Sequence, residues 1–344
     1  MDAYSTNLVS DVKHVRSRPG LYIGGCNNRG LQELWAGVMG ELLANPKSRV
    51  DHALVQIEAD GSLRLDVQGE IEGVLPAADY IPLTCRYDIW GIALAITSAM
   101  SERMELELAQ ENHCWRQHFV KGYAKAAAEP FPWPGRNYLR MRFVPDRELF
   151  ASHFGVDFHS ACGRIQEMAI FHPAITFSAV DASTGHRRDY RYAQGIRSYL
   201  DELEFHSMAN EPKSQWGTPL RLYSLKLTEA GNEAEAVILD RQTGPRAVHA
   251  FVNETRCLEG THIDGLERGI AAVLAQYPDF KWRCDTSKEN DMLGGQTIVL
   301  SLRVPDLAYA GETKDRLASP AAESLVYRMI TGQLPQQIRI DGPA

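Results

Sequence analysis

Apolar and polar positions follow two different periods along the chain, and the changes between them outline its elements. Apolar residues at helical spacing predict helices over 30–44, 87–100, 163–172 and 262–277, with a short helix before Arg18 and another after residue 319. Alternating apolar residues predict strands over 52–59, 61–69, 103–110, 113–122, 138–145, 174–181, 233–240, 246–254 and 296–305. Because strands and helices are mixed throughout, we expect an α+β protein in which both kinds of element pack in layers.

The length and composition are those of a soluble globular chain. It has 344 residues, of which 44% are hydrophobic and 23% charged, enough for two domains. We place them at residues 1–148 and 149–344. The sequence has no apolar run of about 20 residues and no apolar core of a signal peptide at its start, so we expect a cytoplasmic protein without membrane contact.

Charge and cysteine content narrow the classes of function. The net charge of −8 argues against a general polyanion-binding surface, although a local basic groove stays open as an alternative. The six cysteines are far apart and form no C-x-x-C pair, which predicts neither a metal cluster nor a disulfide framework. We therefore expect no metal and free or buried thiols.

The segment KHVRSRPGLYIGG, residues 13–25, is the first landmark of the chain. Pro19 disfavours helical geometry in the residue before it, so the opening helix should end there. We expect the stretch from Pro19 to Gly24 to hold the N-terminal segment against the first domain.

Five segments, in one order over nearly the whole chain, resemble those of the bacterial type IIA topoisomerase B subunits, the gyrase B and topoisomerase IV ParE group. VRSRPGLYIGG is similar to the element RPGMYIG that begins their ATPase region. The others are GRIQEMAIFHPAITFSAVD, QGIRSYLDEL, FVNETRCLEGTHIDGLERGI and GGQTIVLSLRVPDLAYAGETKDRLAS. The resemblance implies a GHKL-type ATPase α/β sandwich followed by a ribosomal-S5-like transducer domain.

The catalytic positions of that family are changed in this chain. Its members carry, on the second helix, a glutamate that activates water and, four residues later, an asparagine that holds magnesium; here these positions are Gly37 and Glu41. Loss of a positioned base typically lowers the rate by about 10²–10⁴. Glu41 lies one helical turn beyond Gly37, which leaves two interpretations: a rearranged base, or a charge on the helix surface.

The adenine contact is changed as well. The family ends a strand with Asp-x-Gly, whose carboxylate accepts the adenine amino group, and the aligned positions here are Val67 and Gly69. A slip of the alignment by one residue would make Asp66 the contact. Strand side chains alternate, however, so Asp66 should point to the face opposite Val67. Val67 thus opposes adenine binding, because a buried amino group without an acceptor costs about 1–3 kcal/mol.

The phosphate-binding lid is also altered. The family wraps the triphosphate with the backbone amides of a glycine-rich loop, GGLHGVG, at the start of a helix. This chain has YDIWGIA there, in which Gly91 alone is retained and Tyr87 and Trp90 add bulk. Lys314 aligns with the transducer lysine that reaches the γ-phosphate, and without a phosphate it is expected to pair with an acid or to lie on a solvated turn.

We therefore interpret the chain as a gyrase-B-like pseudo-ATPase without cofactor, which acts as a scaffold for a protein partner such as a topoisomerase subunit. Any homodimer should be independent of nucleotide. Because the ATP site is changed at so many positions, we expect a stand-alone paralogue rather than a fragment of a longer subunit. One alternative is an ATP-dependent topoisomerase B-subunit fragment with a rebuilt nucleotide site. Another is a DNA-binding module that uses Arg140, Arg142 and Arg147.

Overall fold

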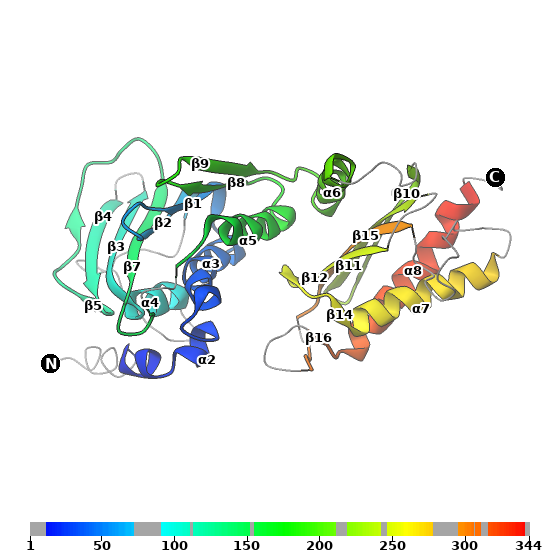
Figure 1. Ribbon diagram of the computed structural model, residues 1–344, viewed down its shortest axis with the longest axis horizontal. Coiled ribbons are helices and arrows are strands. Elements are labelled where there is room, and N and C mark those ends of the chain that lie inside the picture. Colours follow the sequence, from blue (N-terminus) through cyan, green and yellow to red (C-terminus); the bar gives the residue numbers. More distant parts are fainter. Residues whose placement is uncertain are drawn as a thin grey trace. The chain divides into compact units, whose positions relative to one another are not determined.

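The computed structural model describes residues 12–71, 91–110, 113–151, 155–210, 219–241, 246–277, 295–305, 307–310 and 316–340. The chain forms two compact units, whose elements are labelled in Figure 1. Unit 1 comprises Met1–Ala169 and Ala174–Arg191, and unit 2 comprises Ile170–Pro173 and Tyr192–Ala344.

Unit 1 is built on a nine-stranded sheet with the order β5-β4-β3-β7-β2-β1-β8-β9, in which β6 also pairs with β4. The strands are β1 (Arg49–Ile57), β2 (Leu63–Glu70), β3 (Ser101–Gln110), β4 (His113–Val120), β5 (Tyr123–Ala124), β6 (Glu129–Pro130), β7 (Tyr138–Pro145), β8 (Thr176–Asp181) and β9 (His186–Tyr190). Strand β8 runs parallel to β1, and the other neighbours are antiparallel.

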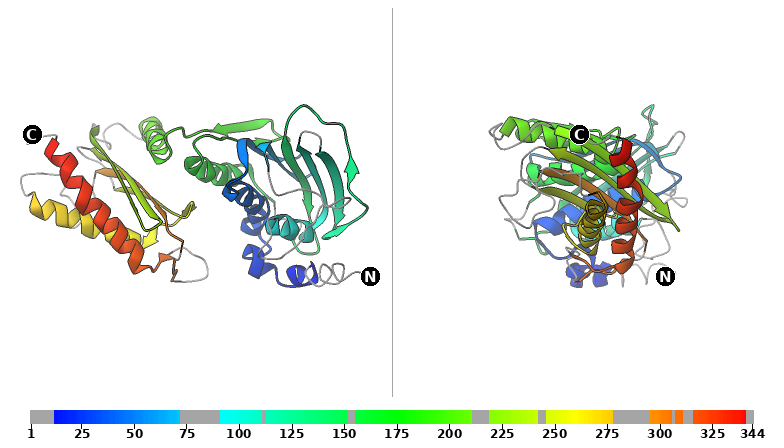
Figure 2. Two further views of the ribbon diagram at one scale, coloured as in Figure 1. Left: turned by 180° about the vertical axis from the view of Figure 1, so that it is seen from behind. Right: turned by 90° about the vertical axis from the view of Figure 1, so that its right-hand side faces the viewer.

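The helices of unit 1 cover one face of this sheet, as Figures 1 and 2 show for α3, α4 and α5. They are α2 (Pro19–Ile23), α3 (Asn28–Ala44), α4 (Ile92–Ala99) and α5 (Phe158–Phe171), preceded by a helical stretch over 12–17. Alternate strand residues supply the core, and in β2 these are Leu63, Leu65 and Val67, all buried. The opposite face of the sheet carries charged side chains.

The opening segment packs into unit 1. The first helical stretch ends at residue 17, directly before Arg18 and the proline at the start of α2. The guanidinium of Arg16 donates to the carbonyl of Ala99 (2.7 Å) and to the carboxylate of Asp146 (2.6 Å). Ile23 is buried, and Gly24 ends α2 in the left-handed region at φ 72°.

The division into units differs from the boundary expected after residue 148. The segment that contains α5, β8 and β9 falls almost wholly within unit 1. The cause is the pairing of β8 with β1, in which Ala53 lies opposite Phe177 and Val55 opposite Ala179. A parallel neighbour requires a crossover, and α5 supplies it.

Unit 2 contains a five-stranded sheet with the order β10-β11-β15-β12-β13 and a two-stranded sheet of β14 and β16. Its strands are β10 (Pro219–Glu229), β11 (Asn232–Arg241), β12 (Ala247–Val252), β13 (Thr255–Arg256), β14 (Glu259–Gly260), β15 (Gln296–Arg303) and β16 (Arg316–Leu317). Helices α7 (Thr261–Gln276) and α8 (Pro320–Ile340) form one apolar core with this sheet. Helix α6 (Ile196–Asn210) lies on the side of the five-stranded sheet opposite α7 and α8, as Figure 1 and the left view of Figure 2 show.

Most of the expected elements are present among the described residues, with altered ends. The helix expected over 87–100 is observed as α4, which begins at Ile92. The first four residues of the expected range, 87–90, lie outside the described part of the chain. The helix expected over 163–172 begins earlier, at Phe158. The longer elements that were not anticipated from the sequence are β9, α6 and β10. The short helix α2 and the two-residue strands β5, β6, β13, β14 and β16 were not anticipated either.

Candidate functional site

The resemblance assigned eight positions to nucleotide chemistry, and five of them lie on or beside three elements of unit 1. Gly37 and Glu41 are on α3, Val67 and Gly69 are near the end of β2, and Gly91 directly precedes α4. The other three, Tyr87, Trp90 and Lys314, lie outside the described residues.

Glu41 binds the N-terminal end of α4. Its carboxylate accepts hydrogen bonds from the backbone N–H groups of Gly91 (3.2 Å) and Ala93 (2.9 Å). Gly91 is the N-cap residue at φ 107°, and α4 has no side-chain cap of its own. A helix N-terminus presents unpaired N–H groups and a positive partial charge, so a carboxylate is a natural ligand for it. Glu41 is thus neither a bare surface charge nor a group left free to act as a base.

The half-buried position of Glu41 affects its protonation. Burial raises the pKa of its carboxyl above the ordinary value, and the bonds from Ala93 and Gly91 oppose that rise without cancelling it. The charged form is therefore less favoured than in water although two amides bind it.

Helices α3 and α4 approach closely beside this contact. A Cβ atom added to Gly37 would lie 3.4 Å from the Cβ of Ala93. The hydroxyl of Thr97 donates to the carbonyl of Leu34 at 2.8 Å, which ties the next turn of α4 to α3. The structure thus brings Gly37, Glu41 and Gly91 together.

The β2 positions are held by the sheet. Val67 is fully buried and lies opposite Ala53 on β1 and Leu139 on β7. Asp66 points to the other face, as the alternation of the strand predicts, and accepts two bonds from Arg140, at 2.8 and 2.7 Å. Asp66 is therefore committed to an ion pair on the face opposite the helices.

Gly69 has a structural reason to be glycine. Its φ is 132°, and a Cβ atom there would lie 2.0 Å from the carbonyl oxygen of Arg49 on the neighbouring strand. The backbones of β1 and β2 are too close at this point for any side chain. This glycine is explained by the sheet without any reference to a nucleotide.

The face of the sheet opposite the helices carries a network of ion pairs centred on Arg140. Its guanidinium binds Asp66 and also Glu107, at 3.2 Å, and both acids are buried. Glu107 further accepts from Tyr138 (3.1 Å) and from Arg116. Burial and the neighbouring Glu107 raise the pKa of Tyr138 to about 12.

These pairs bear on the basic residues considered for DNA binding. Arg140 and Arg142 share one face of β7, as expected, but each has an acidic partner on a neighbouring segment. Arg142 binds Asp60 at 3.0 Å and Ser62 at 3.0 Å. Because carboxylates already neutralise both guanidinium groups, this face offers little free positive charge to a phosphate backbone.

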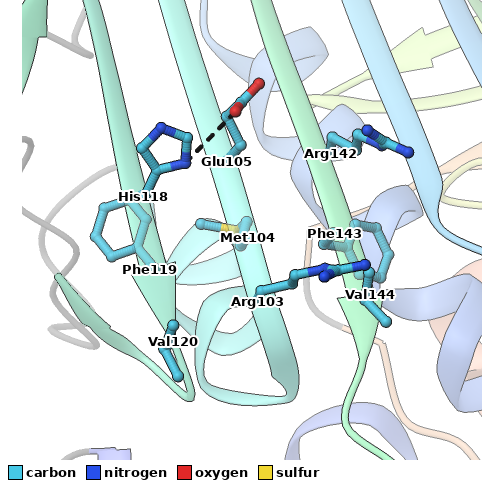
Figure 3. Close-up of a pocket in the computed structure, with 9 residues that line it drawn as sticks. All are labelled: Arg103, Met104, Glu105, His118, Phe119, Val120, Arg142, Phe143 and Val144. Atoms are coloured by element: carbon cyan, nitrogen blue, oxygen red, sulfur yellow. Dashed lines mark ion pairs between the residues drawn. The ribbon is translucent and has the colours of Figure 1, made fainter. Parts of the chain in front are cut away.

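A cavity of about 330 Å³ lies on the same sheet, between β3, β4 and β7 (Figure 3). His118 and Glu105 form an ion pair of 3.4 Å across it. Of the positions assigned to nucleotide chemistry, the five that the structure describes do not line it. Its residues are Arg103, Met104, Glu105, His118, Phe119, Val120, Arg142, Phe143 and Val144.

The described residues hold no cluster of three or more metal-ligating side chains. Four cysteines in this part of the chain are thiols outside any disulfide bond, and burial raises the pKa of three of them, Cys26, Cys114 and Cys162. No helix in the described ranges is long and apolar enough to cross a membrane.

Comparison with known proteins agrees with this architecture. The family model DNA gyrase B matches residues 195–341. The gyrase B protein of chloroplasts and mitochondria from Oryza sativa is 23% identical over 98% of this chain and 50% of its own length. The topoisomerase 4 B protein of Staphylococcus epidermidis is 25% identical over 98% of this chain and 54% of its own. The chain thus spans about half the length of the curated relatives that it matches.

Solved structures give the same result for the fold. The 43K ATPase domain of Thermus thermophilus gyrase B aligns with a TM-score of 0.75 at 20% identity, over 96% of this chain and 90% of that one. The gyrase B protein of Myxococcus xanthus aligns with a TM-score of 0.72 at 20% identity, over 95% and 96%. The fold is therefore α+β and is similar to that of the gyrase B ATPase domain. Over nearly its whole length the chain resembles the B subunits of type IIA topoisomerases.

Proposed function

We propose that this chain is a gyrase-B-like protein that does not bind or hydrolyse ATP and serves as a scaffold for protein interaction. One observation supports the proposal above the others: the carboxylate of Glu41 is bound to the amides of Gly91 and Ala93 at the head of α4. In the proteins that the chain resembles, this helix head receives the triphosphate.

An internal carboxylate opposes phosphate binding in two ways. It takes the N–H groups that a phosphate would need, and its negative charge repels a phosphate in the same place. The displacement of Glu41 would also leave a half-buried carboxylate without its two donors. A bound nucleotide would have to overcome both effects.

Two further positions act in the same direction. Gly37 has no side chain that could activate water, and Glu41, one helical turn further along α3, is engaged by α4. Val67 is buried and apolar where an acceptor for the adenine amino group is expected. The loss of one such contact, about 1–3 kcal/mol, weakens binding roughly ten- to a hundredfold.

Calorimetry with a non-hydrolysable ATP analogue and magnesium tests the proposal. We expect no saturable binding up to millimolar concentration for the natural chain. The variant Glu41→Gln keeps the shape but removes the charge, and Glu33→Gln on the same helix is its control. Saturable binding by the natural chain near micromolar concentration would contradict the proposal and favour a topoisomerase B-subunit fragment with a rebuilt nucleotide site.

The scaffold role needs a separate test. The relatives carry the names of topoisomerase subunits, so the partner that we propose is a subunit of gyrase or topoisomerase IV. The purified DNA-cleaving subunit of either enzyme, titrated into this chain, should bind without nucleotide, and to the same extent when the ATP analogue is added. If neither of these proteins binds, the scaffold part of the proposal fails while the nucleotide part stands. Duplex DNA is the third ligand to test, and binding that weakens steeply with salt would support a DNA-binding module instead.

A further inference from the structure

In unit 2, helix α8 covers the outer edge of strand β10 with two glutamine side chains. The amide of Gln333 accepts from the N–H of Lys226 (2.9 Å) and donates to its carbonyl (2.5 Å). One turn later, Gln337 makes the same pair of bonds with Ser224, at 3.2 and 2.6 Å. Two side chains thus provide the donors and acceptors that a neighbouring strand would provide.

The covered groups belong to an edge strand. Among the strands that the structure describes, β10 pairs with β11 alone, and this pairing extends over almost the whole strand. In an antiparallel ladder, successive residues direct their N–H and C=O groups to opposite sides. Ser224 and Lys226 direct theirs away from β11, toward α8. An uncovered edge of this kind is a template for pairing with another strand.

The cover is weakest close to these bonds. Helix α8 contains Pro335, which lies between the two glutamines and has no N–H for the helical ladder. Gly332 precedes it by three residues, and glycine also disfavours a helix interior. Beyond this point the helix is held to unit 2 by the buried side chains of Leu334 and Ile338 and by the glutamine bonds.

We propose that the edge of β10 is a strand-pairing surface that the last turns of α8 keep closed, and that the strand it accepts is β10 of a second copy of this chain. The sequence of β10 is self-complementary in one antiparallel register. Pairing about Leu225 places Ser224 opposite Lys226 of the second copy, so that the outward backbone groups of both strands meet. The same register places Arg221 opposite Glu229 of the second copy, at both ends of the pair.

Helix α8 also binds Glu229, the acidic residue that would pair with Arg221 of the second copy in this register. The guanidinium of Arg328 donates to the carboxylate of Glu229 at 2.7 Å. Arg328 lies before Gly332, so opening of the last turns would expose the backbone groups of Ser224 and Lys226, and Glu229 would exchange Arg328 for Arg221 of the second copy on pairing. The surface lies within unit 2 and shares no residue with the Glu41 site. The pairing is therefore independent of the function proposed for that site.

Sedimentation equilibrium of the full chain tests the proposal. The double variant Gln333→Ala/Gln337→Ala should lower the dimer dissociation constant at least about tenfold, because four bonds that compete with pairing are removed. Gln336→Ala is the matched control: its side chain bonds to Gly332 within the helix and does not reach β10, so the constant should not change. Adding Lys226→Pro to the double variant removes one pairing N–H and should restore the original constant.

The register has its own test. A mixture of a Ser224→Cys chain with a Lys226→Cys chain, both carrying the glutamine substitutions, should form a disulfide-linked dimer under mild oxidation. Either chain alone should form much less. The two single glutamine variants are measured as well, in case the double variant does not fold. The proposal is overturned if folded glutamine variants associate no more than Gln336→Ala, or if Lys226→Pro leaves their association unchanged.

Discussion

The carboxylate of Glu41 on α3 accepts a hydrogen bond of 2.9 Å from the backbone N–H of Ala93, the second residue of α4. A helix that lacks a cap of its own thus receives one from a neighbouring helix. The same contact fixes α4 against α3 and occupies the anion-binding end of α4. We therefore expect both the stability of α4 and the proposed exclusion of a nucleotide to depend on this one side chain.

Replacement of this side chain should lower stability. For Glu41→Ala we expect a loss of about 1–2 kcal/mol in the free energy of unfolding, the usual effect of removing a helix cap. Glu33→Ala removes a partly buried carboxylate of the same helix that caps no helix end, so it should change this free energy by less than Glu41→Ala does. Urea denaturation of the two variants measures the difference, and equal stabilities would show that the contact does not support α4.

The raised pKa of Glu41 predicts how stability changes with pH. The folded state binds the proton of this carboxyl more tightly than the unfolded state, whose pKa is near the ordinary 4.5. The stabilising contribution is then fully present below that value and is lost as the pH rises through the higher pKa of the folded state. The difference in unfolding free energy between the natural chain and Glu41→Gln, measured from pH 4 to pH 7, should change in favour of the variant as the pH rises. A difference that does not vary with pH would contradict this.

The spacing of apolar residues predicted the amphipathic helices and strands, because each of these elements buries one face. Helix α3 and strand β2 follow their expected limits within a few residues, and Leu63, Leu65 and Val67 face the core as alternation requires. Strand β10 was missed because its apolar residues change phase between Leu222 and Tyr223. The structure has a register irregularity near the start of this strand.

The role of Glu41 could not be read from the sequence. The residues that it bonds lie fifty and fifty-two positions further along the chain. A glutamate on a helix has the same local pattern whether it is solvated or caps another helix. The absence of a side chain at Gly37, by contrast, is visible in the sequence, since it needs only the family pattern for comparison.

Gly69 should not tolerate a side chain. For Gly69→Ala we expect a loss of at least about 2 kcal/mol in stability, because the new Cβ would meet the carbonyl of Arg49 at 2.0 Å and the φ of 132° is strained for alanine. Gly40→Ala is the control. It lies in α3 with no atom within 4 Å of the added Cβ, so it should gain about 0.5–1 kcal/mol. Thermal melts of the two variants should shift in opposite directions, and a melting temperature for Gly69→Ala equal to that of the natural chain would show that β1 and β2 are not held this closely.

Arg140 and Arg142 lie two residues apart on one face of β7, yet their removal should have very different effects. Arg140 neutralises two carboxylates, Asp66 and Glu107, that are only 4% and 5% exposed in their side chains. For Arg140→Met we expect a loss of about 3–5 kcal/mol, because the buried carboxylate of Asp66 loses its cation while Glu107 keeps Arg116 and Tyr138. Arg142 and Asp60 are each 48% exposed, and for Arg142→Met we expect a change of only about 0–1 kcal/mol, as is typical of a surface pair. A third variant, Asp66→Asn/Arg140→Met, should recover part of the loss, since the unpaired charge of Asp66 is then gone. Chemical denaturation at neutral pH compares all three, and similar losses for the two single variants would mean that the network around Arg140 is as solvated as the pair on the rim.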